Sequence, residues 1–329
     1  MTVEPAQLSG WAPIRFHWRD AQAMMDWCHL GELGFKDSFF EQTINQALRR
    51  PFSLLFRHQT PMEDLCELAA RQPGLPPTGF IFHMSRCGST LVSQMFAALD
   101  SSVVISEAPP IDQVLRAQFQ NTAVDESVRV QWLRGVISAL GQRRTGREQR
   151  FFVKFDSWHI LQLPLIVRVF PEVPWIFIYR DPVEVMVSHH RQCGAQMMPG
   201  VIAPEWLGMQ SAAFASLEEY CARVLGNFCA AAAAHRDLGR GRIVHFRELP
   251  GAVTGSLLKF FGMECSEDEL SLVRHAAQFN AKTPSLTYED DSAAKNREAT
   301  DDLRQLAQQW ITGPYEKLEK LRAAQPGLG

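Results

Sequence analysis

A run of small, polar and basic residues in the first third of the chain has the composition of a phosphate-binding loop. Residues 83–90 read HMSRCGST, and an apolar segment with helical periodicity begins at Leu91. Gly88 lets the backbone approach a ligand closely, and the free N–H groups at a helix N-terminus attract anions. The loop therefore offers these candidate anion-binding residues: Ser85, Arg86, Cys87, Gly88, Ser89 and Thr90.

Two familiar loop types match this segment poorly. The nucleoside-triphosphate loop G-x-x-x-x-G-K-[ST] carries a lysine before its hydroxyl residue, and Ser89 stands at that position. A phosphatase loop with a cysteine nucleophile closes on an arginine, whereas here Arg86 precedes Cys87. We interpret Cys87 as a small packing residue. For the loop taken alone, a plain strand-to-helix turn remains the alternative.

A second cationic position lies much further along the chain. The apolar run 175–179 is followed by RDPVEVMVS, residues 180–188. Asp181 and Pro182 suit the N-cap and first position of a helix, so Ser188 falls nearly two turns into it. Arg180 supplies a permanent charge with fork geometry and Ser188 a compact donor, which together suit a phosphate. The alternative is a local ion pair of Arg180 with Asp181, and a solvated Ser188.

Together the two segments resemble the PAPS-dependent sulfotransferases, and their motif pattern is nearest to the protein-tyrosine and bacterial members. Residues 82–91 are similar to the loop that holds the 5′-phosphosulfate of 3′-phosphoadenosine-5′-phosphosulfate (PAPS) in that family, and Arg180 and Ser188 match the pair that grips its 3′-phosphate. The resemblance implies a P-loop-like enzyme that transfers a sulfonate group from PAPS to a hydroxyl group of a small-molecule or peptide acceptor. Adenosine 3′,5′-bisphosphate (PAP) is then the second product.

Sulfonyl transfer needs a base for the proton of the acceptor. Glu107 directly follows the apolar run 103–106, and its distance from the loop resembles that of the catalytic glutamate in protein-tyrosine sulfotransferases. The resemblance implies that Glu107 is the general base for an in-line attack. A solvated loop carboxylate is the alternative, and Asp112 is a fallback base.

The departing bisphosphate needs positive charge beside it. Lys154 closes the apolar run 151–154, and its spacing before Arg180 matches a lysine that the tyrosine sulfotransferases use near the leaving group. The resemblance implies this role for Lys154, with Arg86 as its partner. A salt bridge between Lys154 and Asp156 is the alternative.

The polar stretch 281–297 precedes a terminal helical region. Family members fold such a C-terminal segment over the donor and contribute a serine and a basic residue. The resemblance therefore implies donor contacts from Ser285 and Lys295. A solvated, disordered loop is the alternative.

These residues need elements that bring several strand ends to one edge of a sheet. We predict buried parallel strands at residues 80–84, 103–106, 151–154, 175–179 and 243–246. Helix-like stretches alternate with them at residues 90–99, 127–140, 158–170, 182–191 and 211–235. The alternation predicts a three-layer α/β fold, a doubly wound parallel sheet with helices on both faces, whose ligands bind at the carboxyl ends of the strands. The irregular stretch 192–206 is predicted to be a loop over the site.

The chain is predicted to have one core with an N-terminal addition. Residues 21–68 are interpreted as helical, and they end in the loop QPGLPP. We therefore expect an N-terminal helical extension, residues 1–77, packed on a sulfotransferase α/β domain, residues 78–329, which includes a C-terminal segment that covers the donor.

The composition limits the partners. Lys and Arg total 33 against 36 Asp and Glu, so a net charge of −3 gives no global field for nucleic acid or an anionic membrane. We expect neither as a partner, and a homodimer is one possible assembly. No stretch reaches the roughly 20 apolar residues of a membrane span, and the seven cysteines have no CxxC spacing. Reduced thiols, a cytoplasmic location and a metal-free mechanism are expected.

Two other classes of protein stay open at this point. A P-loop kinase or NTPase would use a similar sheet and helix terminus, but the loop lacks its lysine. A catalytically inactive nucleotide-binding protein would keep the anion site without needing Glu107 or Lys154.

Overall fold

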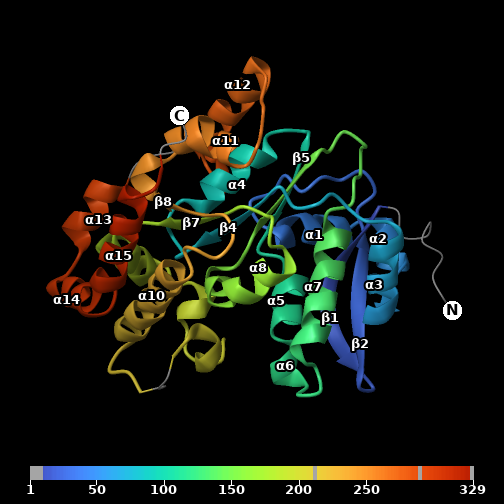
Figure 1. The fold of residues 1–329 in the computed structure, drawn as a ribbon, viewed down its shortest axis with the longest axis horizontal. Helices are drawn as coiled ribbons and strands as arrows, with labels where there is room; N and C mark the ends of the chain where they lie inside the picture. The colour runs from blue at the N-terminus through green and yellow to red at the C-terminus, as the bar shows by residue number, and fades with distance from the viewer. Residues whose placement is uncertain (1–9, 210–212, 288–290, 327–329) are drawn as a thin grey trace. The chain divides into compact units, whose positions relative to one another are not determined.

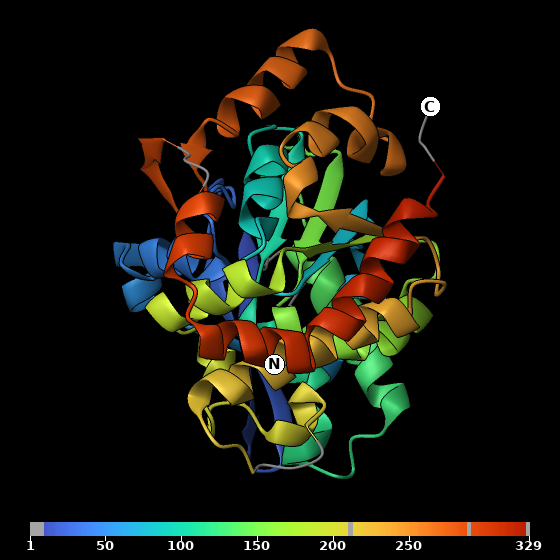
Figure 2. The ribbon, with the colours of Figure 1, turned by 90° about the vertical axis from the view of Figure 1, so that its left-hand side faces the viewer.

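The structure is a computed structural model that describes residues 10–209, 213–287 and 291–326 (Figures 1 and 2). The chain divides into two compact units. Unit 1 comprises Met1–Gly79 and Ser93–Lys154, and unit 2 comprises Phe80–Val92 and Phe155–Gly329. The predicted boundary at residue 77 divides the chain differently and stays a prediction.

Five parallel strands follow the order β5-β6-β4-β7-β8 and are flanked by helices. They are β4 (Gly79–His83), β5 (Ser102–Ser106), β6 (Arg150–Lys154), β7 (Trp175–Tyr179) and β8 (Gly241–His245). Almost every residue of these strands is buried, as expected for the short, continuous apolar runs of a parallel sheet. The predicted α/β fold class is confirmed. The strand order reverses at β4, and ligands of doubly wound sheets bind at such a reversal.

Strands β5 and β6 belong to unit 1, and the pairs β4–β7 and β7–β8 belong to unit 2. Ser102 pairs with Arg150 in the first, Phe80 with Trp175 in the second and Trp175 with Gly241 in the third. These registers bring the last residues of neighbouring strands level within each unit.

The N-terminal region of unit 1 corrects our interpretation of residues 21–68 as helical. It contains a three-stranded antiparallel sheet, β1 (Trp11–Arg19), β2 (Gln22–His29) and β3 (His58–Pro61). Asp20 and Ala21 make the β1–β2 turn with φ values of 48° and 63°, which the mirror-image turns of tight hairpins require. The usual Asn-Gly or Asp-Gly signal is missing here, and β2 is buried on both faces, so neither turn residues nor alternation revealed this hairpin.

Helices complete unit 1. They are α1 (Phe40–Leu48), α2 (Pro51–Leu55), α3 (Met62–Arg71), α5 (Pro109–Leu115), α6 (Ala117–Gln120) and α7 (Glu126–Leu140). Asp125 caps α7 by accepting a hydrogen bond from the Val128 N–H at 2.9 Å. Helix α7 packs on α3 and β1, and a Cβ at Gly135 would lie 2.6 Å from Leu65 Cδ2. The α3–α7 contact therefore depends on a glycine.

The remaining helices belong to unit 2. Its α-helices are α8 (Leu163–Val169), α9 (Pro182–Arg191), α10 (Leu217–Ala234), α11 (Leu258–Phe260), α12 (Glu267–Ala276), α13 (Ser292–Glu298), α14 (Asp301–Trp310) and α15 (Thr312–Ala323), and α4 (Ser89–Ala97) begins in this unit. Helices α14 and α15 pack against α10 (Figure 2), and α13 packs against α9. The contact between α13 and α9 places part of the C-terminal region against the helix that follows β7.

Shorter elements fill the remaining connections of unit 2. They are the 3-10 helices η2 (Ser157–Gln162), η3 (Ala195–Met197), η4 (Pro204–Leu207) and η5 (Phe246–Glu248), the π-helix η6 (Val253–Leu257), and the two-stranded sheet of β9 (Phe279–Asn280) and β10 (Thr283–Thr287). The stretch 192–206 is irregular, as predicted. In the described part of the chain, every helix is too short or too polar to cross a bilayer.

Candidate active site

The loop after β4 has an unusual backbone. Ser85, Arg86 and Gly88 have φ values of 80°, 52° and 85°, and the first two are rare for residues with a side chain. The Ser85 N–H donates to His83 Nδ1 at 3.0 Å, so the other ring nitrogen of His83 carries the proton that it donates to the Phe155 carbonyl at 3.1 Å. Backbone turns of this kind form anion-binding concavities.

Close packing makes Gly88 and Cys87 part of the loop's framework. A Cβ at Gly88 would lie 2.9 Å from the Phe246 ring and 3.1 Å from Leu249. Cys87 is fully buried, and its thiol donates to the Ile178 carbonyl at 3.0 Å. The thiol therefore faces β7, and its position suits packing better than nucleophilic attack. Ser89 and Thr90, at the start of α4, are also buried.

Arg180 is a buried cation held on three sides. It follows β7, and its Nε donates to Glu184 at 2.5 Å, while one terminal nitrogen donates to Asp291 at 2.8 Å and to Ser292 at 3.0 Å. Its guanidinium carbon lies 3.9 Å from the centre of the Phe246 ring. Burial lowers the pKa of Arg180, but the hydrogen bonds to Asp291 and Glu184 outweigh this effect and raise it. Arg180 is therefore always charged.

The structure does not show the alternative interpretation, an ion pair between Arg180 and Asp181, among the described residues. Asp181 accepts hydrogen bonds from the N–H groups of Val183 and Glu184 at 3.0 and 3.2 Å, and so caps α9. The cap frees Arg180 for the partners described above.

Arg86 joins the loop after β4 to the segment that carries Arg180 and Ser188. Its Nη2 donates to the Ser188 carbonyl at 3.5 Å and to the carbonyl and side chain of Gln192 at 3.2 Å. Ser188 is buried on α9. Burial lowers the pKa of Arg86 from its ordinary value, which in an arginine still leaves the charge in place. Two motifs that are distant in sequence thus meet in unit 2.

The C-terminal candidates have different outcomes. Lys295, on α13, is 4% exposed, and its Nζ lies 2.8 Å from Asp291 Oδ2. Asp291 therefore bridges Arg180 and Lys295 with one oxygen each. Burial lowers the pKa of Lys295. Ser285 is exposed on β10. On either side of residues 288–290, which lie outside the described residues, the stretch forms β10 and most of α13, where the alternative interpretation expected one solvated loop.

Sequence reasoning missed Asp291 and Glu184, which neutralise these cations. Glu184 follows Arg180 by four residues, and Asp291 precedes Lys295 by four. Opposite charges at this spacing meet on a helix, so both pairs left a readable signal. The Arg180–Asp291 contact left none, because the two residues lie far apart in the chain.

His189 is a further buried group of this region. Its Nδ1 accepts a hydrogen bond from the Gly194 N–H at 3.3 Å, whereas its Nε2 has no partner among the described residues. Burial, followed by the charges of Arg86, Lys282 and Lys295, lowers its pKa to about 3. His189 is therefore neutral at physiological pH and lies in a positive environment.

Gln196 ties the stretch 192–206 to the loop after β4. Its amide nitrogen donates to Ser85 Oγ at 3.1 Å and to Ser157 Oγ at 3.2 Å. The stretch that we predicted to lie over the site therefore contacts one of the predicted anion-binding residues.

The predicted catalytic pair lies in unit 1. Lys154, the last residue of β6, is fully buried, and its Nζ forms an ion pair with Glu107 Oε1 and lies 5.4 Å from the centre of the Phe39 ring. Glu107 has a φ of 55°, and its N–H donates to the Lys154 carbonyl at 2.8 Å. Glu107 is thus a positioned carboxylate. Lys154 forms its ion pair with Glu107, whereas the alternative interpretation paired Lys154 with Asp156.

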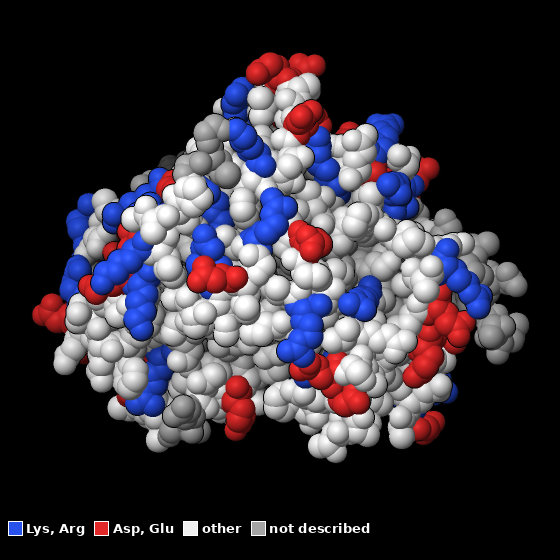
Figure 3. Space-filling model, viewed as in Figure 1, with Lys and Arg blue, Asp and Glu red and all other residues white. Residues whose placement is uncertain are grey.

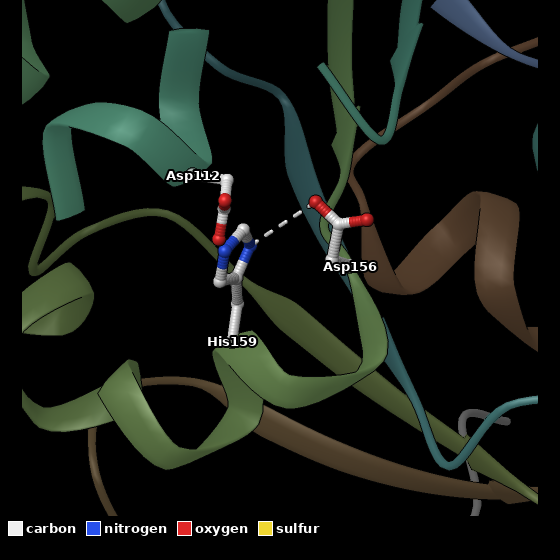
Figure 4. Close-up of side chains that lie close together, drawn as sticks. All are labelled: Asp112, Asp156 and His159. Carbon is white, nitrogen blue, oxygen red and sulfur yellow. Dashed lines mark ion pairs between the residues drawn. The ribbon is translucent and has the colours of Figure 1, made fainter. Parts of the chain in front are cut away.

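The other carboxylates near these strands have partners of their own. Asp112, the fallback base, is buried on α5 and forms an ion pair with Arg116. In unit 2, Asp156 Oδ2 lies 3.7 Å from Nδ1 of the buried His159, and Figure 4 draws all three of Asp112, Asp156 and His159. The metal-free mechanism stays a prediction. On the face shown in Figure 3, acidic and basic side chains are interspersed, as the charge balance predicts.

Comparisons with known proteins identify the family. Among solved structures, the sulfotransferase domain of the curacin biosynthetic pathway is 16% identical, with 72% of this chain and 98% of that chain covered and a TM-score of 0.43. A sulfotransferase from Alicyclobacillus acidocaldarius is 12% identical (76% and 97% covered, TM-score 0.44), and a mouse sulfotransferase complexed with PAP is 10% identical (80% and 94% covered, TM-score 0.43). No curated protein matches the sequence. The model of the sulfotransferase family matches residues 77–267, more than half of the 329 residues, and spans the loop after β4, Glu107, Lys154, Arg180 and Ser188. The chain belongs to the sulfotransferase family.

Proposed function

We propose that the protein is a PAPS-dependent sulfotransferase that transfers a sulfonate group to a hydroxyl of a small-molecule or peptide acceptor. The observation that carries the proposal is the meeting of two anion anchors within unit 2. Arg86 donates to the Ser188 carbonyl, and the Phe246 ring lies against both the Gly88 backbone and the Arg180 guanidinium. A donor with phosphates on both sides of one ribose needs two such anchors close together.

The chain's residues divide between the two ends of this donor. Ser85, Arg86, Cys87, Gly88, Ser89 and Thr90 would hold the 5′-phosphosulfate through backbone N–H groups and short side chains. Arg180 and Ser188 would hold the 3′-phosphate, and the charge of Lys295 lies beside them through its shared partner Asp291. Ser285 is assigned to the donor on the resemblance alone. The PAP in the mouse relative is the product expected from this donor.

Asp291 gives the anchor a counter-ion before any donor arrives. Its carboxylate takes one donor from Arg180 and one from Lys295, and hydrogen bonds from these two residues hold its pKa below its usual value although burial acts in the opposite direction. A phosphate has the same charge sign and similar acceptor geometry. Donor binding therefore exchanges the carboxylate of Asp291 for a phosphate on at least one of these cations.

Glu107 and Lys154 would carry out the chemistry. Glu107 takes the proton of the acceptor hydroxyl while that oxygen bonds to sulfur, and the bond between sulfur and the phosphate oxygen breaks on the opposite side. Lys154 holds the carboxylate of Glu107 in position through their ion pair. The resemblance also assigns Lys154 and Arg86 to the positive charge that would stabilise the departing PAP.

The substitution Glu107→Gln tests this assignment. It removes the base and keeps the size, so we expect turnover to fall about 10³-fold, within the usual range for general-base catalysis. PAP release from PAPS would be followed with a panel of phenols, alcohols and tyrosine peptides, while calorimetry checks that PAP affinity is retained. Glu41→Gln, an exposed glutamate of α1, is the control.

The outcomes separate the alternatives. Wild-type turnover in Glu107→Gln would show that another group is the base. A parallel loss of PAP affinity would make Glu107 a structural residue. A preference for ATP over PAP would return the protein to the kinase or NTPase class, and PAP binding without transfer to any acceptor would indicate an inactive binding protein.

A further inference from the structure

Four large apolar side chains are exposed on α2 of unit 1 and on its C-cap residue, Phe56. Phe52, Leu54, Leu55 and Phe56 are 45%, 60%, 78% and 56% exposed. Ser53 is buried, and the Phe52 ring packs against His29 and Phe56 with ring centres 4.6 and 4.8 Å away. The side chains of Leu54 and Leu55 are the most exposed of the four. Such clusters on a protein surface mark sites that bind a partner or a membrane.

Arginines flank this cluster on both sides. Arg49, Arg50 and Arg57 are all exposed, and none of them forms an ion pair among the described residues. Residues 42–62 contain these three arginines and no Asp or Glu, although the whole chain carries a net charge of −3. We call the four apolar residues and three arginines the α2 patch.

We propose that the α2 patch docks the protein on an anionic lipid bilayer. Leucine and phenylalanine side chains insert at the boundary between headgroups and acyl chains, while arginines at the same level bind anionic headgroups. Each such arginine raises the affinity for an anionic surface about fivefold. The expectation of no membrane partner came from the total charge of the chain, and a total charge does not reveal a local cluster of arginines.

A second copy of the chain fits the patch less well. In a two-fold symmetric dimer the same patch faces itself, which would bring three arginines without ion-pair partners among the described residues against three others. A bilayer offers the opposite charge together with an apolar interior. The high exposure of Leu55 also indicates a protruding side chain, which suits insertion better than a role as the floor of a groove.

Flotation with lipid vesicles tests the proposal on the full chain. We expect binding to vesicles of phosphatidylcholine that contain about 30% phosphatidylserine, an anionic lipid of the cytoplasmic leaflet. We expect little binding to vesicles of phosphatidylcholine alone. Leu54→Ser with Leu55→Ser should lower the partition coefficient at least tenfold, because two exposed side chains lose their apolar insertion. Arg49→Gln with Arg57→Gln should lower it about 25-fold on the anionic vesicles only.

Matched variants control for charge and hydrophobicity. Arg134→Gln with Arg147→Gln removes two other exposed arginines, and Leu272→Ser removes a leucine that is 50% exposed on α12. Both should bind as the wild type does, and thermal unfolding of every variant reports on the fold.

Three results would overturn the proposal. They are absence of binding to the anionic vesicles, equal binding to both kinds of vesicle, and wild-type binding by the leucine variant. Dimerisation that the leucine substitutions abolish, without vesicle binding, would assign the patch to a second copy of the chain.

Discussion

The protein carries two groups of cations that are built in opposite ways. Arg180 and Lys295 in unit 2 are buried, and each has a carboxylate partner in Glu184 or Asp291. The three arginines of the α2 patch in unit 1 are exposed and have no ion-pair partner among the described residues. Buried charges must be paired to be tolerated, and pairing fixes their geometry. The first group therefore suits recognition of one small anion, and the second suits a broad anionic surface.

The largest expected effect is the loss of a buried charge. Arg180→Met leaves the buried Glu184 without its partner, so we expect the free energy of unfolding to fall by about 3 kcal/mol. Arg49→Gln, in the exposed group, should change it by less than about 0.5 kcal/mol. Urea unfolding of both variants measures the contrast. Equal effects of the two substitutions would show that burial does not distinguish these groups.

A pH titration sharpens the description of the buried group. The pKa of His189 is lowered from 6.5 to about 3, so the folded state keeps it neutral while the unfolded state takes up a proton. Its contribution to stability is complete above pH 6.5 and is lost as the pH falls toward 3. Between pH 7 and pH 5 the loss should be about 2 kcal/mol.

The substitution His189→Asn isolates this contribution. Asparagine can still accept the Gly194 hydrogen bond but does not titrate, so the variant should lose about 2 kcal/mol less than the wild type over the same interval. His190→Asn, at an exposed position beside Glu218, is the adjacent control. Identical pH profiles for the wild type and His189→Asn would mean that His189 titrates normally.

The smallest expected effect concerns the counter-ion of the anchor. Asp291→Asn removes a negative charge from between Arg180 and Lys295, so PAP should bind about tenfold more tightly, or about 1.4 kcal/mol. Calorimetry measures this change, and Asp302→Asn, at an exposed position of α14, makes the same change of charge elsewhere. Weaker binding in Asp291→Asn would show that Asp291 orders the anchor and does not compete with the phosphate.

Local sequence patterns predicted most of the fold and part of the candidate site. The five strands of the parallel sheet were predictable because each has a short apolar core, and Asp181 with Pro182 indicated the start of α9. The β1–β2 hairpin was not, because Asp20 and Ala21 are an unusual turn pair and β2 is buried on both faces.

In the candidate site, the proposed anchors Arg180 and Ser188 could be identified from one continuous segment of the sequence. Asp291 could not be assigned to Arg180, because their contact depends on the packing of α13 against α9. The pairing of Lys154 with Glu107 likewise depends on the register of β5 and β6. Long-range contacts of this kind leave no trace in spacing.

The most direct test of the account compares PAP with AMP, which lacks the 3′-phosphate, by calorimetry on the wild type and on Arg180→Lys. We predict that the wild type binds PAP at least 100-fold more tightly than AMP or ATP. Lysine keeps the charge but loses the fork geometry, so Arg180→Lys should reduce this preference about tenfold and leave the affinity for AMP unchanged. Equal binding of PAP and AMP by the wild type, or a preference for ATP, would contradict the assignment of Arg180 to a 3′-phosphate and with it the proposed donor.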